Sequence, residues 1–490
     1  MKIDLGNNKI LLPCPFHPIL SIIYPKVAMK KRDISFINIY IHIITLVILL
    51  SSCQNGNANK SKNHSNNSLF DTDSVNSLGM DHLKRFYAKL SALNQGQINK
   101  VRILQFGDSH TACDWMTGEL RRLFSKRFGS GGPGFIHVAK PWSWYYHTLV
   151  DVQTRKLRIH NPEELDDSPF IRFIKNPFDV FYQYLDGNSP VNKKRDDGWT
   201  HYRSLFSHKY KDRRLAYGLG GVRSVGNNTK STIQCREGDF DHIELWYHEK
   251  PKRGQLILSV NQQHKLIPPD SRLKPRIRRF IYELPSPEKE LSIEIKGENS
   301  VTLYGMVLES SKRGIVFDTL GLDGAKIEDL LRQDWDKTLK TQLAWRQPDL
   351  IILAYGTNSL YDPRFHPKHY QHQFRSLIQT IQRATRHSVD ILVLGPPDKN
   401  ILIATKRRKA KDWVTPPRLK EIVEAQITAS MTRNVAFINP FALMGGEGSM
   451  KRFVQKKLGQ KDHTHFTKRG YQKMAQEIYA ILMKHYDENR

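Results

Sequence analysis

The segment Val101-Arg-Ile-Leu-Gln-Phe-Gly-Asp-Ser-His-Thr-Ala-Cys-Asp-Trp115 predicts a strand, a tight turn and a helix. Its apolar residues Ile103, Leu104 and Phe106 lack the polar alternation of a half-exposed strand, so we expect a strand buried between layers of helices. Ser109 would then lie at the carboxyl end of this strand and at a helix N-terminus, where ligands bind and developing negative charge is favoured. Because Asp and Ser are also ordinary turn and N-cap residues, the turn alone does not decide between a catalytic and a structural role.

Three further blocks accompany this turn. The run Leu350-Ile-Ile-Leu-Ala-Tyr-Gly-Thr-Asn358 predicts a second buried strand, and Val316-Phe-Asp-Thr-Leu-Gly-Leu-Asp-Gly324 predicts a third that ends in a glycine turn. Near the C-terminus, Asp462 and His465 precede a helix with an apolar stripe. The four blocks, in this order, resemble the SGNH (GDSL-type) hydrolase superfamily. His110 departs from the family pattern, since leucine is common there, but it lies outside the reacting set.

The resemblance implies a serine hydrolase without a cofactor. Ser109 would be the nucleophile, His465 its general base, and Asp462 the carboxylate that orients the imidazole. The backbone N–H groups of Ser109 and Gly324 and the side-chain amide of Asn358 would form the oxyanion hole. Alternatively, Asp462, His463 and His465 could be metal ligands, but no other ligand pattern completes such a site, so we expect no metal. His110 and His463 are then expected to be local hydrogen-bonding or surface residues.

A long segment separates the first helix, which we expect from about Asp114 to Phe128, from the next hydrolase block. Its strand-like runs alternate polar and apolar residues, which predicts an antiparallel β-sandwich; they cover residues 242–248, 255–260, 290–295 and 301–308. An SGNH domain interrupted by a carbohydrate-binding-module-like sandwich resembles the peptidoglycan O-acetylesterases of Gram-negative bacteria. The predicted fold is therefore a flavodoxin-like parallel α/β sheet with helices on both faces and an inserted antiparallel β-sandwich.

The expected organisation of the chain follows from these blocks. We expect residues 1–28 to be an over-extended start, 29–53 a lipoprotein signal, 54–79 a flexible linker, 80–139 and 314–490 the two parts of the hydrolase domain, and 140–313 the inserted sandwich. The glycine-rich run at 128–134 follows a helix and not a strand, which argues against a dinucleotide-binding loop.

The segment from Met29 resembles a bacterial lipoprotein signal. A basic start at Met29-Lys-Lys-Arg32 precedes a mostly apolar run that is shorter than the about 20 residues of a membrane span, and Leu50-Ser-Ser-Cys53 follows. On this resemblance Cys53 becomes the lipidated N-terminus, and the protein lies in the periplasm, anchored to a membrane, with the outer membrane of a Gram-negative bacterium favoured. An uncleaved anchor and an ordinary signal peptide are the alternatives, and each of them exports the protein.

The 490 residues carry a formal net charge of +28, which favours acidic partners. No helix-turn-helix, zinc-finger or RNP pattern is present, so no nucleic acid is expected. The run Lys406-Arg-Arg-Lys409 predicts a basic loop after a strand, either at the mouth of the active site or simply solvated. Cys113 and Cys235 lie too far apart in sequence to predict a disulfide.

The leading hypothesis is an exported serine esterase that removes O-acetyl groups from N-acetylmuramoyl units of peptidoglycan through an acetyl-serine intermediate. One alternative is an acetyltransferase or deacetylase of another envelope polysaccharide, and a second is a non-catalytic glycan-binding lipoprotein. Trp142 and Trp144 are candidate sugar-binding residues at the junction of the two domains, whereas Trp246, inside an alternating strand, is expected in the core. The sequence leaves the oligomeric state open.

Overall fold

The computed structural model describes residues 2–4, 9–11, 72, 75–157, 197–205, 216–270, 272, 274–331, 338–386, 388–404 and 411–488. The chain divides into two compact units, Met1–Asn67 and Ser68–Arg490. In the first unit, β1 (Lys2–Asp4) and β2 (Lys9–Leu11) form an antiparallel pair. The predicted signal with Cys53 and the basic run at 406–409 lie outside the described residues. Within the described parts of the chain, the helices are too short or too polar to cross a membrane.

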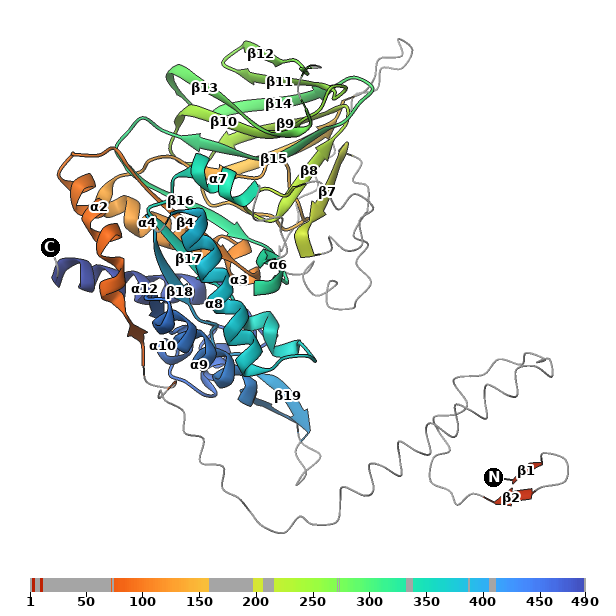
Figure 1. Ribbon diagram of the computed structural model, residues 1–490, viewed down its shortest axis with the longest axis vertical. Coiled ribbons are helices and arrows are strands. Elements are labelled where there is room, and N and C mark those ends of the chain that lie inside the picture. The colour runs from red at the N-terminus through yellow and green to blue at the C-terminus, as the bar shows by residue number, and fades with distance from the viewer. Residues whose placement is uncertain are drawn as a thin grey trace. The chain divides into compact units, whose positions relative to one another are not determined.

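A six-stranded sheet forms the centre of the second unit (Figure 1). In their spatial order its strands are β16 (Gly314–Gly321), β4 (Lys100–Gly107), β17 (Leu350–Ala354), β18 (Asp390–Leu394), β21 (Ala436–Ile438) and β3 (Ser77–Leu78). The first five are parallel, and β3 closes the edge antiparallel to β21. Because β16 follows β4 in the chain, the five parallel strands have the flavodoxin-like order 2-1-3-4-5, which confirms the predicted α/β fold.

Helices cover both faces of this sheet. The 3-10 and α-helices are η1 (Met80–Leu83), α2 (Lys84–Asn94), α3 (Ser109–Ala112), α4 (Trp115–Phe128), α6 (Ile327–Leu331), α7 (Lys340–Arg346), η4 (Thr357–Tyr361), α8 (Pro367–Ala384), α9 (Pro417–Thr432), α10 (Pro440–Leu443), α11 (Ser449–Gln455) and α12 (Lys468–Glu488). Alternate residues of each strand face opposite layers. Ile352 packs in the core that holds α2, α4 and α12, whereas Ile351 and Leu353 pack in the core that holds α8 and α9.

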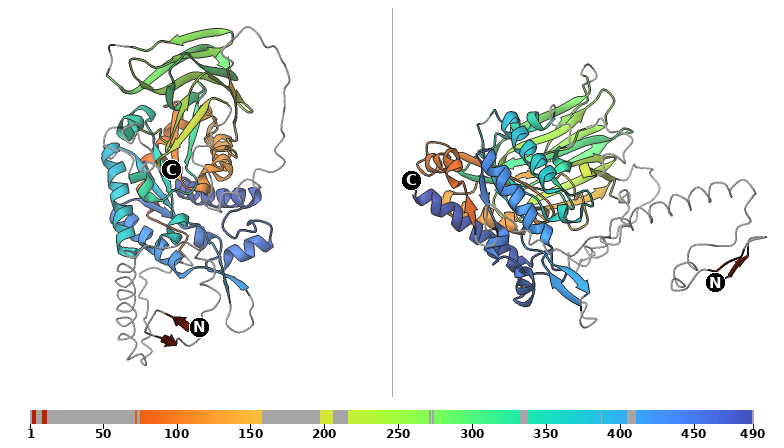
Figure 2. Two further views of the ribbon diagram at one scale, coloured as in Figure 1. Left: turned by 90° about the vertical axis from the view of Figure 1, so that its right-hand side faces the viewer. Right: turned by 60° about the horizontal axis from the view of Figure 1, so that its bottom comes forward.

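Two antiparallel sheets form the sandwich that lies between β4 and β16 in the chain. One sheet contains β13 (Arg276–Glu288), β10 (Phe240–Glu249), β15 (Val301–Glu309), β8 (Val222–Gly226) and β7 (Trp199–Arg203), with β5 (Gly134–Ile136) paired to β15. The other contains β12 (Gln263–Ile267), β11 (Gln255–Val260), β14 (Glu290–Lys296), β9 (Thr229–Cys235) and β6 (Val150–Lys156). Figure 2 shows these strands stacked on one end of the α/β part. The inserted antiparallel sandwich is therefore confirmed.

Buried ion pairs join the sandwich to the central sheet. Arg346, at the end of α7, contacts the carboxylates of Asp318 on β16 and Glu309 on β15. Arg102 on β4 also pairs with Glu309, at 2.8 Å. Burial alone would raise the pKa of Glu309, but the two guanidinium groups lower it to about 2. The sandwich and the central sheet are thus connected through buried arginine and carboxylate groups of opposite charge.

Candidate active site

The nucleophile turn is built by the residues around Gly107. A side chain at Gly107 would lie 2.2 Å from the Thr111 hydroxyl oxygen and 2.8 Å from the carbonyl oxygen of Ala354, so only glycine fits. The Asp108 carboxylate accepts the N–H of His110 at 3.0 Å and caps α3. Ser109 is therefore the first residue of a short helix at the carboxyl end of β4, as the sequence predicts.

Ser109, His465 and Asp462 form a continuous hydrogen-bonded chain. The Ser109 hydroxyl oxygen lies 3.0 Å from Nε2 of His465, and Nδ1 of His465 lies 2.6 Å from Oδ2 of Asp462. The other carboxylate oxygen of Asp462 accepts the backbone N–H groups of Thr464 and His465, each at 3.0 Å. Because the carboxylate accepts the proton on Nδ1, Nε2 is left as the acceptor for the Ser109 proton.

The charge state of Asp462 suits this role. Burial alone would raise its pKa, but the hydrogen bond and charge of His465, with the two backbone N–H groups, lower it to about 2. The carboxylate is thus ionised at neutral pH. Ser109 and His465 are 6% and 9% exposed, so the reacting atoms lie in a largely dehydrated setting where fixed dipoles act strongly.

The structure also brings the predicted oxyanion-hole residues to this edge of the sheet. The N–H of Leu322 donates to the carbonyl of Gly107 at 2.9 Å, which holds the loop after β16 beside the nucleophile turn. The Asn358 amide donates to the carbonyl of Ala325 at 3.1 Å and keeps a second N–H. Gly324 has a φ of +77°, and a side chain there would meet no atom within 4 Å, so its backbone borders open space.

Asp323, which the sequence did not single out, lies beside these groups. Burial raises the pKa of its carboxyl group, and electrostatic interactions with His465 and Arg203 and a hydrogen bond from the backbone N–H of Gly324 oppose this shift. Arg203 is the last residue of β7, a strand of the sandwich. The inserted domain therefore contributes a charge that acts next to the triad.

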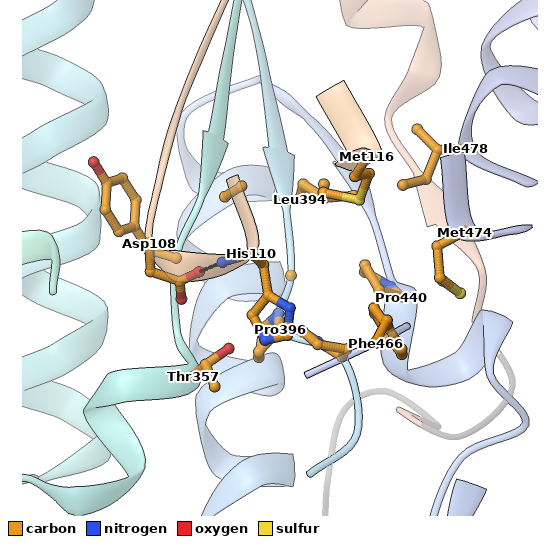
Figure 3. A pocket seen from close by; sticks show the side chains of 14 residues that line it. Asp108, His110, Met116, Thr357, Leu394, Pro396, Pro440, Phe466, Met474 and Ile478 are labelled. Atoms are coloured by element: carbon orange, nitrogen blue, oxygen red, sulfur yellow. Dashed lines mark hydrogen bonds between the residues drawn. The ribbon is translucent and has the colours of Figure 1, made fainter. Parts of the chain in front are cut away.

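A small cavity lies behind the nucleophile turn (Figure 3). Asp108 and His110 form part of its wall, together with apolar side chains that include Met116, Leu394 and Phe466. Its volume of about 30 Å³ holds about one or two water molecules and is far too small for a sugar. Burial lowers the pKa of His110 well below the usual value, and the nearby charges of His465 and Lys399 lower it further, so His110 stays neutral.

His463, His110 and Cys113 make packing or hydrogen-bond contacts and lie outside the triad. The His463 ring stacks on Trp413, with ring centres 3.8 Å apart and planes 5° apart, and is buried and not a surface residue. His110 is also buried and shares a hydrogen bond with the Tyr471 hydroxyl at 3.1 Å. Burial raises the pKa of the Cys113 thiol to about 12, which leaves it a poor nucleophile. Across the described residues, acidic, histidine and cysteine side chains do not gather in groups of three that could hold a metal.

The two candidate tryptophans differ in exposure. Trp142 is 6% exposed and packs in the core shared by both domains, whereas Trp144 is half-buried at the edge of this core, with ring centres 5.3 Å apart. Trp246 is fully buried, in agreement with its place in an alternating strand. A sugar could therefore reach Trp144 more easily than Trp142.

Comparisons with known proteins found one matching family model and several similar solved structures. Residues 297–473 match the GDSL-like Lipase/Acylhydrolase family. Among solved structures, a peptidoglycan O-acetylesterase is similar with a TM-score of 0.61 and 21% identity, over 82% of this chain and 96% of that one. A family two carbohydrate esterase from Cellvibrio japonicus matches with a TM-score of 0.25 and 12% identity, over 60% of this chain and 99% of that one.

No curated protein sequence matches the chain significantly. The family match covers the loop of Gly324, Asn358 and the Asp462–His465 motif. The fold match covers 82% of this chain. With the hydrogen-bonded triad assembled on this sheet, the chain is a carboxylic ester hydrolase that is similar to the GDSL-like acylhydrolases over residues 297–473 and has the α/β fold of the SGNH hydrolases.

Proposed function

We propose that the protein removes O-acetyl groups from peptidoglycan through an acetyl-serine intermediate. The observation that carries the proposal is the Ser109–His465–Asp462 chain, with hydrogen bonds of 3.0 and 2.6 Å. The similarity of its fold to that of a peptidoglycan O-acetylesterase supports the choice of substrate.

The geometry supports a two-step reaction. Ser109 attacks the acetyl carbonyl carbon while His465 takes the hydroxyl proton at Nε2, and the ionised Asp462 stabilises the resulting imidazolium. His465 then returns the proton to the departing sugar oxygen, which leaves acetyl-Ser109 and a free sugar hydroxyl. In the second step His465 takes a proton from water, the hydroxide equivalent attacks the acetyl-serine, and acetate leaves as Ser109 regains its proton.

The tetrahedral intermediate of each step carries a negative oxygen. The N–H groups of Ser109 and Gly324 and the second N–H of the Asn358 amide are donors of the right kind at the same edge of the sheet. A donor fixed in advance at such an oxygen typically contributes about 3 to 4 kcal/mol to transition-state stabilisation. Helix α3 is only one turn long, so we assign the stabilisation to these individual donors and not to a helix dipole.

The test measures acetate released from O-acetylated peptidoglycan. We expect wild type to release acetate and Ser109→Ala to lose at least about a thousandfold in turnover while its circular dichroism is unchanged. Ser388→Ala, at an exposed serine, serves as the matched control. A folded Ser109→Ala variant that keeps its activity would remove the proposal. Acetyl groups found on an added glycan acceptor, in place of free acetate, would identify the enzyme as a transferase.

We further propose that the protein is exported and held at a membrane by lipid on Cys53. The support is the basic start, apolar run and Leu50-Ser-Ser-Cys53 sequence. One acyl chain binds a bilayer only marginally, so a firmly held protein carries more than one. Mass spectrometry of the N-terminal peptide and membrane fractionation test this. A soluble wild-type protein with unmodified Cys53 would disprove the anchor, and Cys53→Ala is the control.

A further inference from the structure

Lys399 is a buried cation at the edge of the active site. It is 6% exposed, and its ammonium group makes no hydrogen bond or ion pair with any described residue. It follows β18 at the carboxyl edge of the sheet, and the N–H of the next residue, Asn400, donates to the carbonyl of His463 at 2.9 Å. Lys399 therefore lies beside the loop that carries Asp462 and His465. Such a group is costly to bury unless an anion pairs with it.

The aromatic ring of Tyr361 lies next to this ammonium. The distance from Nζ of Lys399 to the ring centre is 4.2 Å, which is a cation–π contact. Tyr361 ends η4, the 3-10 helix that also carries Asn358, and is 59% exposed. Partial burial and then the negative charge of Asp462 raise the pKa of Tyr361, so its hydroxyl group also lies near the triad.

The nearby carboxylates of Asp462 and Asp108 do not form an ion pair with the Lys399 ammonium group. Burial lowers its pKa to about 8, although the charges of Asp462 and Asp108 oppose this shift. The Asp462 oxygens already accept three hydrogens from Thr464 and His465, and Asp108 accepts the N–H of His110. These carboxylates act on Lys399 through space, and none of the described residues accepts a hydrogen bond from its ammonium group, which can therefore bind a ligand.

We infer that Lys399 and Tyr361 form a subsite for a carboxylate-bearing sugar beside the acetyl ester that Ser109 attacks. The ammonium would bind the carboxylate, and the exposed ring would lie against an apolar face of the sugar, as aromatic side chains with one wet face can. This inference rests on the proposed function and narrows its substrate. Muramoyl units carry a lactyl carboxyl group, which is either free or joined to a peptide that has its own carboxylates.

The experiment compares three acetyl esters with the full-length protein: an O-acetylated muramoyl saccharide with a free lactyl carboxylate, the same saccharide as its lactyl amide, and 4-nitrophenyl acetate. For Lys399→Met we expect KM on the free acid to rise about tenfold more than on the amide or the neutral ester. Lys399→Arg should restore KM, since the cation is kept. Lys368→Met, at an exposed lysine on α8, is the matched control for loss of one positive charge.

A pH series gives a second readout. Above about pH 8 the free enzyme loses the Lys399 proton, so KM of wild type for the free acid should rise, whereas that of Lys399→Arg should stay low. The two proteins share all other titratable groups that act on or lie beside Lys399, which are Asp108, His110, Tyr361, Asp462 and His463.

Each outcome decides the inference. Equal losses on all three esters would show that Lys399 acts on the triad, and unchanged KM values would show that it binds no substrate, so either overturns the subsite. The same saccharide joined to its peptide is assayed as a fourth substrate. A rise in KM for Lys399→Met on this substrate, without a rise on the lactyl acid, would assign the anion to the peptide and overturn the lactyl subsite. If Lys399→Met does not fold, Tyr361→Ala and the wild-type pH series still decide. Failure of wild type to release any glycan acetate would instead overturn the proposed function.

Discussion

Replacing Asp462 by asparagine changes one heavy atom of the triad and tests whether Asp462 sets the tautomer of His465. In wild type the carboxylate accepts the Nδ1 proton of His465 at 2.6 Å. An asparagine of the same shape can turn its NH₂ group toward Nδ1 and keep its oxygen on the N–H groups of Thr464 and His465. The imidazole proton would then move to Nε2, where it blocks acceptance of the Ser109 proton.

The expected loss is large for activity and moderate for stability. The wrong tautomer should lower kcat about 10⁴-fold, which corresponds to about 5.5 kcal/mol of transition-state free energy. The folded-state pKa of Asp462 is about 2 against an ordinary 3.8, so its charge contributes about 2 kcal/mol to folding. Because this pKa is depressed, the contribution is fully present above pH 3.8 and is lost as the pH falls through about 2.

The assay is kcat on 4-nitrophenyl acetate together with urea unfolding at pH 7 and near pH 2. We expect the stability difference between wild type and Asp462→Asn to shrink at the lower pH, and kcat to fall about 10⁴-fold at neutral pH. A variant that keeps more than a tenth of wild-type kcat would refute the assignment of Asp462 as the residue that orients His465. A stability difference that is equal at both pH values would refute the charge argument.

Three further outcomes follow from the geometry. Asn358→Ala removes one oxyanion donor and should lower kcat about 10² to 10³-fold on 4-nitrophenyl acetate, and a change confined to KM would contradict this. Gly324→Ala puts a side chain on a residue with a φ of +77°, so thermal unfolding should show a loss of about 1 to 2 kcal/mol, although the new methyl group meets no atom within 4 Å. Arg346→Met leaves Asp318 and Glu309 buried with their main partner gone and should cost about 3 to 5 kcal/mol in urea unfolding; a variant as stable as wild type would show that the ion pairs contribute little.

The parallel strands could be predicted from the sequence because their signals are local. Residues 350–354 are a continuous apolar run, residues 101–107 are apolar apart from Arg102 and Gln105, and a glycine turn ends or follows each run, which is the pattern expected of a buried parallel strand. The break between α3 and α4 at Asp114 is not visible in the sequence, because a left-handed φ of 53° at an aspartate depends on contacts made later in the chain. The same holds for β5, whose three residues begin at the end of the glycine-rich run and form a strand by pairing with β15.

The candidate site divides in the same way. Ser109 and the Asp462–His465 pair lie in short sequence motifs from which their chemical roles can be predicted, and the structure brings them within hydrogen-bonding distance. Lys399 lies in no such motif, since its proposed role depends on its burial and on its contact with the ring of Tyr361 at the end of η4. One signal was available, because Lys399 closely follows a predicted parallel strand at the edge where such sheets bind ligands.

The inserted sandwich and the catalytic turn are held by one network, which explains how an insertion can separate two neighbouring strands without disturbing the site. The Asp114 carboxylate accepts hydrogen bonds from Arg121 on α4, from the backbone and hydroxyl of Thr148, where the chain enters the sandwich, and from Thr319 on β16, where it has returned. These contacts fix the helices after Ser109 against both ends of the insertion. Since β4 and β16 pair in register up to Gly107 and Gly321, the nucleophile and the loop of Gly324 keep their relative positions through the folded sandwich.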